Sequence, residues 1–300
     1  MDRAYPRLIL GCGNFGGIGS APAFFGRGET KEQAFELMDA AWAKGITWFD
    51  TADAYGGGRS ETYIGEWIRS RRHHGLRLTT KTFNPMNEGE DHGLAPARVR
   101  RQIDSSLRRL GVERVDLYLA HDWDPDVPVA EVVGVFDELV AGGKIGAYGF
   151  SNVDAAQLRR VLGLGNVGAV QNSYSLLDRE VERDVLPLSA EMHVWFQAFS
   201  PLAGGWLTGK YRRDAEVPEG SRMTMRPGPY EHLRDDRVYN ALEQLERGGN
   251  PATLAFAWLL GDRRVSVVVG PRRPEHLRPA LAALADPLTP GQREELAALF

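Results

Sequence analysis

The sequence predicts an α/β fold in which eight parallel strands and their helices close into one (β/α)8 TIM barrel. Short apolar segments alternate with amphipathic helical segments along all 300 residues, and no change of composition marks a linker. Residues 1–300 are therefore expected to form a single domain. Eight of the apolar segments have a mostly continuous hydrophobicity, which is typical of strands that are covered on both faces in a parallel sheet.

The predicted strands are short and rich in β-branched, aliphatic and aromatic residues. In chain order they are 7–10, 47–50, 76–81, 115–121, 145–150, 167–171, 193–199 and 265–269. Helical periodicity occupies most of the intervals, with Thr30 as a cap for the first helix and Gly111 and Gly142 at the ends of the next two. The predicted helices are 31–44, 96–110, 129–141, 154–162, 180–191, 235–247, 251–260, 274–285 and 290–299.

One long segment, 203–234, has no clear strand or helix pattern and contains many glycines, prolines and arginines. An irregular segment of this length inside a compact domain is usually functional or disordered. We expect it to fold over a bound ligand at the mouth of the barrel.

Composition and charge exclude several classes of function. The formal net charge is −4, so no electrostatic footprint for nucleic acid is expected. The apolar runs are too short to span a bilayer, and the first residues, "MDRAYPRLILGCG", lack the apolar core of a signal peptide. Cys12 is the only cysteine and no H-x-x-x-H pattern occurs, so no metal site is expected. These features predict a cytoplasmic protein, and they leave its oligomeric state open.

Polar residues stand at the carboxyl ends of the predicted strands, where barrels of this class carry their active sites. Asp50, Lys81 and His121 follow strands two, three and four, and Tyr55 lies in the loop after strand two. Neighbouring strands supply Asp50 and Lys81, so an ion pair between them would satisfy a carboxylate that is otherwise costly to bury. We expect the lysine charge to lower the pKa of Tyr55 from its free value of about 10, which would suit a general acid, and His121 to orient a substrate carbonyl.

Taken singly, each of these residues also has a structural interpretation. An Asp–Lys pair often only stabilises a fold, a histidine after a strand is often neutral and satisfied, and a tyrosine beside a glycine-rich turn often only packs. Their joint position at consecutive strand ends favours a catalytic site. The stretch "GCGNFG" at 11–16 matches G-x-G-x-x-G, but no helix opens directly after it, which argues against a Rossmann dinucleotide site.

The sequence resembles the aldo-keto reductase family along nearly its whole length. The matching stretches, in the family's order, are "GITWFDTADAYGGGRSETYIGEW", "TTK", "VDLYLAH", "GKIGAYGFSN", "AVQNSYSLLDR", "AFSPLAGGWLTGKY" and "VVVGPRRPEHL". The resemblance implies a (β/α)8 barrel that reduces aldehydes and ketones by hydride transfer from NADPH, with a catalytic tetrad on Asp50, Tyr55, Lys81 and His121.

The resemblance also implies contacts to the cofactor. Ser151, Asn152 and Gln171 would hold the nicotinamide carboxamide, and Phe199 would stack on the nicotinamide ring. The other implied contacts are Ser200, Leu202, Gly204 and Lys210 at the pyrophosphate, Gly270, Arg272, Arg273 and His276 near the adenosine 2′-phosphate, and Asn14, Phe15 and Asp50 beside the reacting end. The sequence departs from the family's pattern at Asn14, Phe15, Phe199, His276 and Ala280, which affects the substrate wall and the adenine site.

Two other functions remain open at this point. One is a nicotinamide-binding sensor or accessory subunit of the same fold, and the other is a metal-dependent barrel hydrolase, which the missing ligand clusters disfavour. The pocket wall is expected to include aromatic side chains that suit an apolar or aryl carbonyl compound. The predicted wall consists of Phe24, Phe25, Trp123, Trp206 and residues 220–230.

Overall fold

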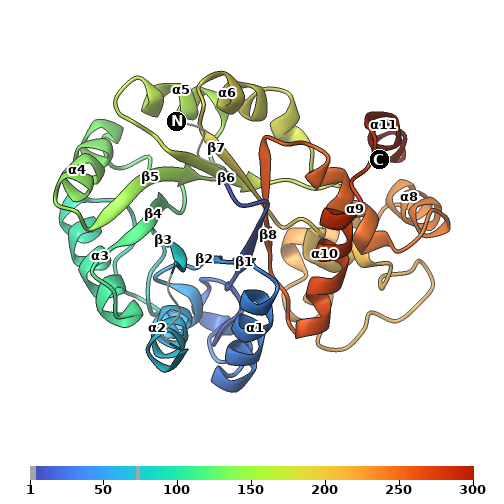
Figure 1. Cartoon of the computed structure of the whole chain (residues 1–300), viewed down its shortest axis with the longest axis horizontal. Helices are drawn as coiled ribbons and strands as arrows, with labels where there is room; N and C mark the ends of the chain where they lie inside the picture. The colour runs from blue at the N-terminus through green and yellow to red at the C-terminus, as the bar shows by residue number, and fades with distance from the viewer. Residues whose placement is uncertain (1–4, 72–74) are drawn as a thin grey trace.

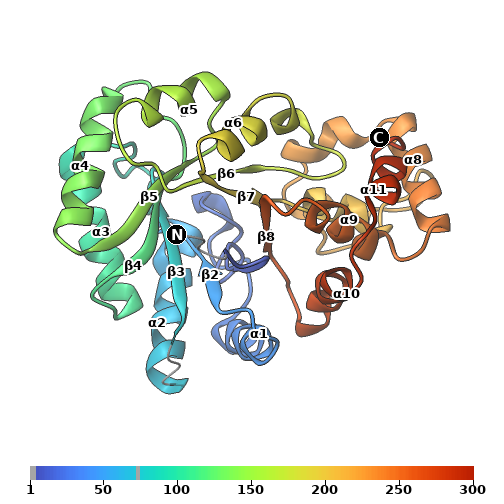
Figure 2. The same cartoon turned by 45° about the horizontal axis from the view of Figure 1, so that its top comes forward.

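The computed structural model describes residues 5–71 and 75–300, and it confirms the single-domain (β/α)8 fold. Eight parallel strands follow one another around a closed barrel, and the helices lie outside it (Figure 1; Figure 2). The strands are β1 (Leu8–Gly11), β2 (Trp48–Asp50), β3 (Arg77–Thr82), β4 (Val115–Ala120), β5 (Ile145–Ser151), β6 (Ala169–Ser173), β7 (Trp195–Phe199) and β8 (Val265–Val269).

The barrel closes because β8 pairs with β1 as well as with β7, with Leu8 opposite Val267. All the pairs are parallel, so every strand presents its carboxyl end at the same rim. In this register Asp50 stands opposite Thr79, two residues before Lys81 on β3. The topology therefore brings the predicted catalytic residues to one mouth.

Most predicted helices are confirmed, with Thr30 capping the first of them and Gly111 ending the second in a left-handed conformation. The α-helices are α1 (Lys31–Ala43), α2 (Arg59–Arg71), α3 (Pro96–Leu110), α4 (Val129–Ala141), α5 (Ala155–Leu162), α6 (Val185–Glu191), α7 (Arg222–Met225), α8 (Asp236–Arg247), α9 (Pro251–Leu260), α10 (Arg278–Ala285) and α11 (Pro290–Ala297). The 3₁₀ helices are η1 (Pro22–Phe24), η2 (Tyr55–Gly58), η3 (Glu180–Glu182), η4 (Ala203–Thr208), η5 (Gly228–Leu233) and η6 (Pro274–Leu277).

Two parts of the chain differ from the expectation. Helix α2 was not predicted, because its buried face includes Ser60, Glu61 and Gly65, which hide the usual apolar periodicity. The segment 203–234 is not irregular throughout, since it contains η4, α7 and η5. Its glycines and prolines obscure these short helical turns in the sequence.

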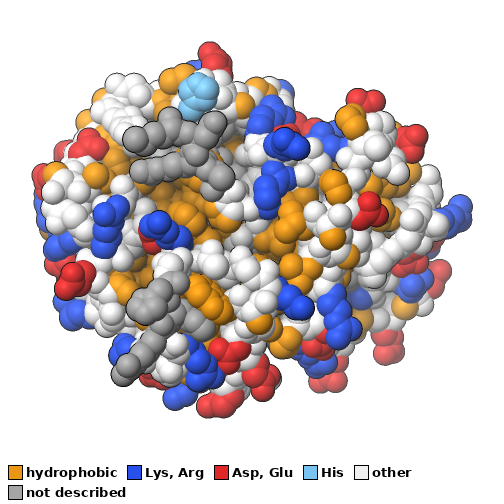
Figure 3. All heavy atoms as spheres, viewed as in Figure 1, with side chains coloured by type: hydrophobic (Ala, Val, Ile, Leu, Met, Phe, Trp, Pro, Cys, Tyr) orange, Lys and Arg blue, Asp and Glu red, His pale blue; other side chains and the backbone are white. Residues whose placement is uncertain are grey.

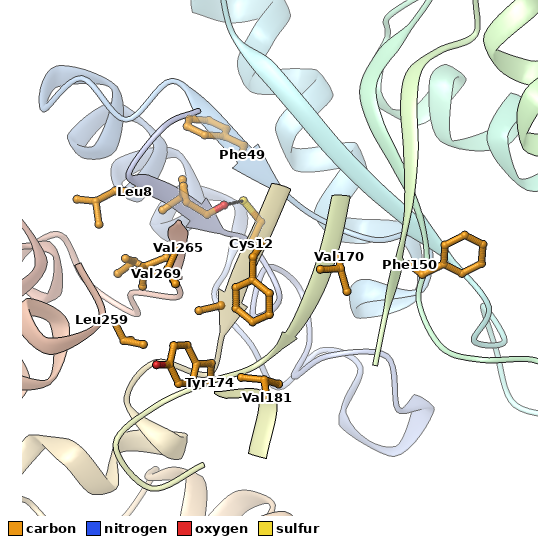
Figure 4. Close-up of a cluster of buried hydrophobic side chains, with 14 of the residues drawn as sticks. Leu8, Cys12, Phe49, Phe150, Val170, Tyr174, Val181, Leu259, Val265 and Val269 are labelled. Carbon is orange, nitrogen blue, oxygen red and sulfur yellow. Dashed lines mark hydrogen bonds between the residues drawn. The ribbon is translucent and has the colours of Figure 1, made fainter. Parts of the chain in front are cut away.

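The hydrophobic core has two parts. A small cluster fills the barrel interior, and the exposed Tyr5 stacks on Trp195 of this cluster with ring centroids 4.4 Å apart. A larger cluster packs the outer faces of the strands against the helices, and Figure 4 shows a group of its side chains, among them Cys12, Phe49 and Tyr174. The barrel interior is thus a packed core and not a pore.

The surface carries charges of both signs. On the face drawn in Figure 3, positive and negative side chains are scattered around the edge and apolar side chains lie nearer the middle. Within residues 5–71 and 75–300, no helix is both long enough and apolar enough to cross a bilayer. The same residues contain no cluster of three or more His, Cys, Asp or Glu side chains that could hold a metal ion.

A buried polar cluster lies between β3 and the helices α2 and α3. Glu61 is fully buried and accepts hydrogen bonds from Thr80 Oγ1 at 2.5 Å and from Arg109 Nε at 2.7 Å. Asp53 is also fully buried, but neither of its carboxylate oxygens has a hydrogen-bond partner among the described residues. Burial, followed by the nearby charge of Glu61, raises the pKa of Asp53 to about 7.

This pKa predicts a pH-dependent effect of Asp53→Asn on stability. The folded protein binds the Asp53 proton more tightly than the unfolded chain, whose reference pKa is 3.8, so the side chain's contribution is lost as the pH rises from about 4 through about 7. Asparagine cannot ionise, so the free energy of unfolding of the variant, minus that of the unaltered protein, should be roughly 2–4 kcal/mol larger at alkaline pH than at pH 4. Denaturant titration at both pH values measures this gain, and Asp214→Asn, at an exposed position, is the matched control. A gain that does not change with pH would contradict the assignment.

Candidate active site

A pocket of about 610 Å³ opens at the carboxyl ends of the strands. Residues at or after the carboxyl ends of all the strands except β3 line its wall. Most of the predicted site residues line it: Asn14, Asp50, Tyr55, His121, Ser151, Asn152, Gln171, Phe199, Ser200, Leu202, Gly204, Lys210, Gly270, Arg272 and His276. The structure therefore brings together side chains that are up to 262 positions apart in the chain (Asn14 to His276).

The predicted ion pair forms at the base of this pocket. Lys81 is fully buried, and its Nζ donates to Asp50 Oδ1 and, at 2.9 Å, to the carbonyl oxygen of Thr51. The other Asp50 oxygen accepts a hydrogen bond from Gln171 Nε2 at 2.8 Å. A buried carboxylate and a buried ammonium are thus each satisfied by several partners, as such groups need to be.

Tyr55 lies directly above this pair. Lys81 Nζ is 5.2 Å from the centre of the Tyr55 ring, and Tyr55 Oη is 3.4 Å from His121 Nε2. Burial raises the pKa of Tyr55 above its ordinary value of 10, while the positive charge of Lys81 acts in the opposite direction and is outweighed. The predicted net lowering of the Tyr55 pKa is therefore wrong in sign, because desolvation of the phenolate costs more than one nearby cation recovers.

His121 is neutral in this environment. Burial, reinforced by the charge of Lys81, lowers the pKa of His121 to about 3. Its backbone oxygen accepts a hydrogen bond from Asn152 Nδ2 at 2.9 Å, and its ring stands edge-on to Tyr55 with an interplanar angle of 78°. A neutral imidazole at the pocket wall has one N–H to offer a ligand.

The opposite end of the pocket carries positive charge from Lys210, Arg222 and Arg272. Arg272 donates from Nε to Glu29 Oε1 at 2.8 Å and from Nη1 to the carbonyl oxygen of Gly220 at 2.7 Å. Arg222 Nη2 donates to Asn14 Oδ1 at 2.9 Å. The segment 203–234 is thereby tied to the loops after β1 and β8, which are neighbouring strands of the barrel.

The backbone around the pocket has unusual conformations at several residues. Asn152, Ser200 and Ala203 all have positive φ, with values of 57°, 53° and 45°. Gly204 has φ 65°, and a Cβ placed on it would lie 2.6 Å from the ring of Tyr230. Non-glycine residues held in this region are uncommon and often occur at functional sites.

Some predicted site residues lie elsewhere. Phe15 is fully buried in the large hydrophobic cluster and does not reach the pocket wall, because its side chain turns into the layer between strands and helices. Arg273 is exposed and does not line the pocket, since it follows Arg272 in an extended backbone.

The predicted aromatic wall also needs correction. Trp206 is buried against Tyr211 and Tyr239, and Phe24, Phe25 and Trp123 do not line the pocket. The segment 220–230 does line it, and its lining residues are Ser221, Arg222, Met225, Arg226, Pro229 and Tyr230. The expectation of an aryl-selective wall built from the four aromatic residues therefore loses its basis.

Several polar residues at the site were missed from the sequence, among them Glu29, Asn84, Asn250 and Glu275. Glu29 lines the basic end but stands just before a helix cap, where an acidic residue has an ordinary structural explanation. Asn84 lies with Nδ2 at 3.3 Å from His121 Nδ1. Its position three residues after Lys81, at the same strand end, is a signal that could have identified it.

Removing Lys81 should raise the pKa of Tyr55 further. Its charge is the largest influence that opposes burial, so Lys81→Met leaves the desolvation and the Asp50 charge without that opposition. The tyrosinate absorbance of the protein, minus that of the same protein carrying Tyr55→Phe, reports this titration. Lys144→Met, which removes a surface ion pair with Asp104, should leave it unchanged. A fall in the pKa of Tyr55 would refute the stated role of Lys81.

Comparisons with known proteins agree with this geometry. The sequence profile described as "Aldo/keto reductase family" matches residues 7–299. The chain is 33% identical over 288 residues to the NADH-specific methylglyoxal reductase of Escherichia coli (strain K12). This alignment covers 89% of this chain and 87% of that protein. It is 31% identical over 303 residues to an aldo-keto reductase of Strobilurus tenacellus, and this alignment covers 97% of this chain and 87% of that protein.

Solved structures give the same result. The glycerol dehydrogenase of Gluconobacter oxydans superposes with a TM-score of 0.85 at 25% identity, covering 100% of this chain and 92% of that one. An aldo-keto reductase of Bacillus halodurans, in its holo form, superposes with a TM-score of 0.78 at 26% identity, covering 98% of this chain and 91% of that one. The chain belongs to the aldo/keto reductase family, and it is an NAD(P)H-dependent oxidoreductase of carbonyl compounds.

Proposed function

We propose that this protein reduces an aldehyde or ketone to an alcohol with NADPH, and that Tyr55 is the general acid. One observation carries the proposal. Tyr55 Oη and His121 Nε2 lie 3.4 Å apart on the pocket wall, close to the buried ion pair between Asp50 and Lys81. A carbonyl oxygen placed between these two groups would meet two hydrogen-bond donors.

Tyr55 is suited to give a proton to that oxygen. Its raised pKa keeps the hydroxyl protonated at neutral pH, so the proton is present when a carbonyl compound arrives. After the transfer, the ammonium of Lys81 stabilises the tyrosinate at close range in a buried site. His121 stays neutral, orients the carbonyl through a hydrogen bond and does not compete as an acid.

The pocket fits a nicotinamide dinucleotide. When bound, the cofactor supplies a hydride for the carbonyl carbon. Ser151, Asn152 and Gln171 would hold the carboxamide, with Gln171 using Oε1 because its Nε2 already donates to Asp50 and Gln197. Phe199 would stack on the nicotinamide ring. The positively charged end, with Lys210 and Arg222, suits the pyrophosphate, and Ser200, Leu202 and Gly204 lie beside it on the same wall.

Tyr55→Phe tests the reaction. The variant should bind NADPH as the unaltered protein does and lose at least about 10²-fold in kcat, because it lacks only the proton donor. The measurement is NADPH oxidation with a panel of aldehydes, ketones and keto-sugars, alongside cofactor binding by fluorescence. Tyr63→Phe, on helix α2, is the matched control. An unchanged kcat in Tyr55→Phe would remove its assigned role, and tight NADPH binding without turnover of any compound would favour a sensor or accessory subunit.

The preference for NADPH rests on Arg272. It lines the basic end of the pocket, where an adenosine 2′-phosphate would accept charge-assisted hydrogen bonds from its guanidinium. Glu29 opposes this preference, because it pairs with Arg272 and is itself only 3% exposed. Burial raises the pKa of Glu29 and Arg272 lowers it, so the carboxylate depends on this arginine for its stabilisation.

Two substitutions should move the preference in opposite directions. Arg272→Ala should narrow the ratio of kcat/KM for NADPH over NADH by roughly tenfold, the value of one charge-assisted hydrogen bond at a partly exposed site. Glu29→Gln should widen it, because it removes the competing carboxylate and frees the guanidinium for the phosphate. Steady-state kinetics with both cofactors at low salt give the ratios. Equal use of NADH and NADPH by the unaltered protein would contradict the proposed preference.

A further inference from the structure

The two ring nitrogens of His121 face different partners. Nε2 points toward Tyr55 Oη, 3.4 Å away, at the pocket wall. Nδ1 points away from the pocket, and Asn84 Nδ2 lies 3.3 Å from it. Asn84 does not line the pocket, so its contact with the site passes through the imidazole.

The amide nitrogen of Asn84 determines where the imidazole proton lies. An amide NH₂ group can only donate, so the nitrogen that faces it must be an unprotonated acceptor. A neutral imidazole carries one proton in total, and that proton is then on Nε2. Burial of the ring, reinforced by the charge of Lys81, disfavours a second proton, so the ring does not escape this constraint by becoming a cation.

The backbone that carries Asn84 is held in place beside His121. Its backbone oxygen accepts a hydrogen bond from Arg98 Nη2 at 2.8 Å. Arg98 is only 2% exposed and also donates from Nη1 to Thr82 Oγ1 and to the carbonyl oxygen of Gly93, both at 2.9 Å. A buried guanidinium thus fixes the turn after β3 that carries Asn84.

We propose that Asn84 is a positioning residue, which holds His121 in the tautomer that has its proton on Nε2, the nitrogen facing Tyr55 and the pocket. This inference rests on the proposed carbonyl reduction for its purpose. With the proton on Nε2, His121 and Tyr55 both donate toward one carbonyl oxygen. With the proton on Nδ1, Nε2 would instead accept the Tyr55 hydrogen and hold back the proton that the reaction needs.

The tautomer can be measured without turnover. The protein labelled with ¹⁵N-histidine is examined by NMR, and the His121 signals are identified by their absence from His121→Asn. In the unaltered protein we expect a protonated Nε2 and an unprotonated Nδ1. A proton on Nδ1 would overturn the inference, even in a protein that reduces carbonyl compounds.

Two substitutions at Asn84 separate positioning from packing. Asn84→Asp replaces the donor by an acceptor, which draws the proton to Nδ1, whereas Asn84→Leu keeps a similar size and imposes no tautomer. At alkaline pH, where the ring stays neutral even beside a carboxylate, Asn84→Asp should lower kcat/KM by about 10²-fold, the cost of one lost donor to a carbonyl oxygen. Asn84→Leu should lose only a few-fold, because a sizeable fraction of the rings still has the productive tautomer.

The control and the readouts keep the outcomes distinct. Asn166→Asp adds the same charge at an exposed position before β6, at the opposite end of the barrel, and should change neither activity nor the His121 signals. Equal losses in Asn84→Asp and Asn84→Leu, with the same tautomer in both, would show a packing role and overturn the inference. If no carbonyl compound is reduced, the proposed function fails, while the NMR signals of the unaltered protein and of Asn84→Asp still decide the inference.

Discussion

The buried ion pair between Asp50 and Lys81 is the interaction on which the rest of the site depends. Lys81 is fully buried, and removing one partner of such a pair typically costs 3–5 kcal/mol because the other charge is left unpaired. The same lysine opposes the rise in the pKa of Tyr55 and helps to keep His121 neutral. One ammonium group therefore links the stability of the barrel to the protonation states of both groups that face the pocket.

Strand β3 connects this pair to the layer of helices. Its side chains alternate between the two faces, so Lys81 points into the barrel while Thr80 and Thr82 bond to Glu61 and Arg98 on the outside. Arg98 then holds the turn that carries Asn84. The geometry of the reacting groups is thus supported from behind by a buried polar cluster, and the raised pKa of Asp53 makes this cluster sensitive to pH.

The two ends of the pocket differ in their electrostatics. At the reacting end, the charges are paired and buried, and the groups that face the pocket are neutral donors. At the other end, Lys210, Arg222 and Arg272 face it as cations, and Glu29 neutralises part of their charge. This arrangement suits a ligand with a phosphate-bearing part and an uncharged reacting part, and Glu29 would compete with a phosphate for Arg272.

The sequence by itself determined the strands, most of the helices and the four residues Asp50, Tyr55, Lys81 and His121, because strand hydrophobicity and the order of polar residues at strand ends are local patterns. Only the tertiary structure decided how those groups behave. The pKa of Tyr55 rises because enclosure by the whole barrel outweighs the one lysine, a balance that no local pattern contains. Helix α2 was missed and Phe15 was misplaced, because both depend on which faces of the chain become buried when it folds. Asn84 and Glu29 acquire their roles from His121 and Arg272, partners 37 and 243 positions away, which only chain folding brings within hydrogen-bond distance.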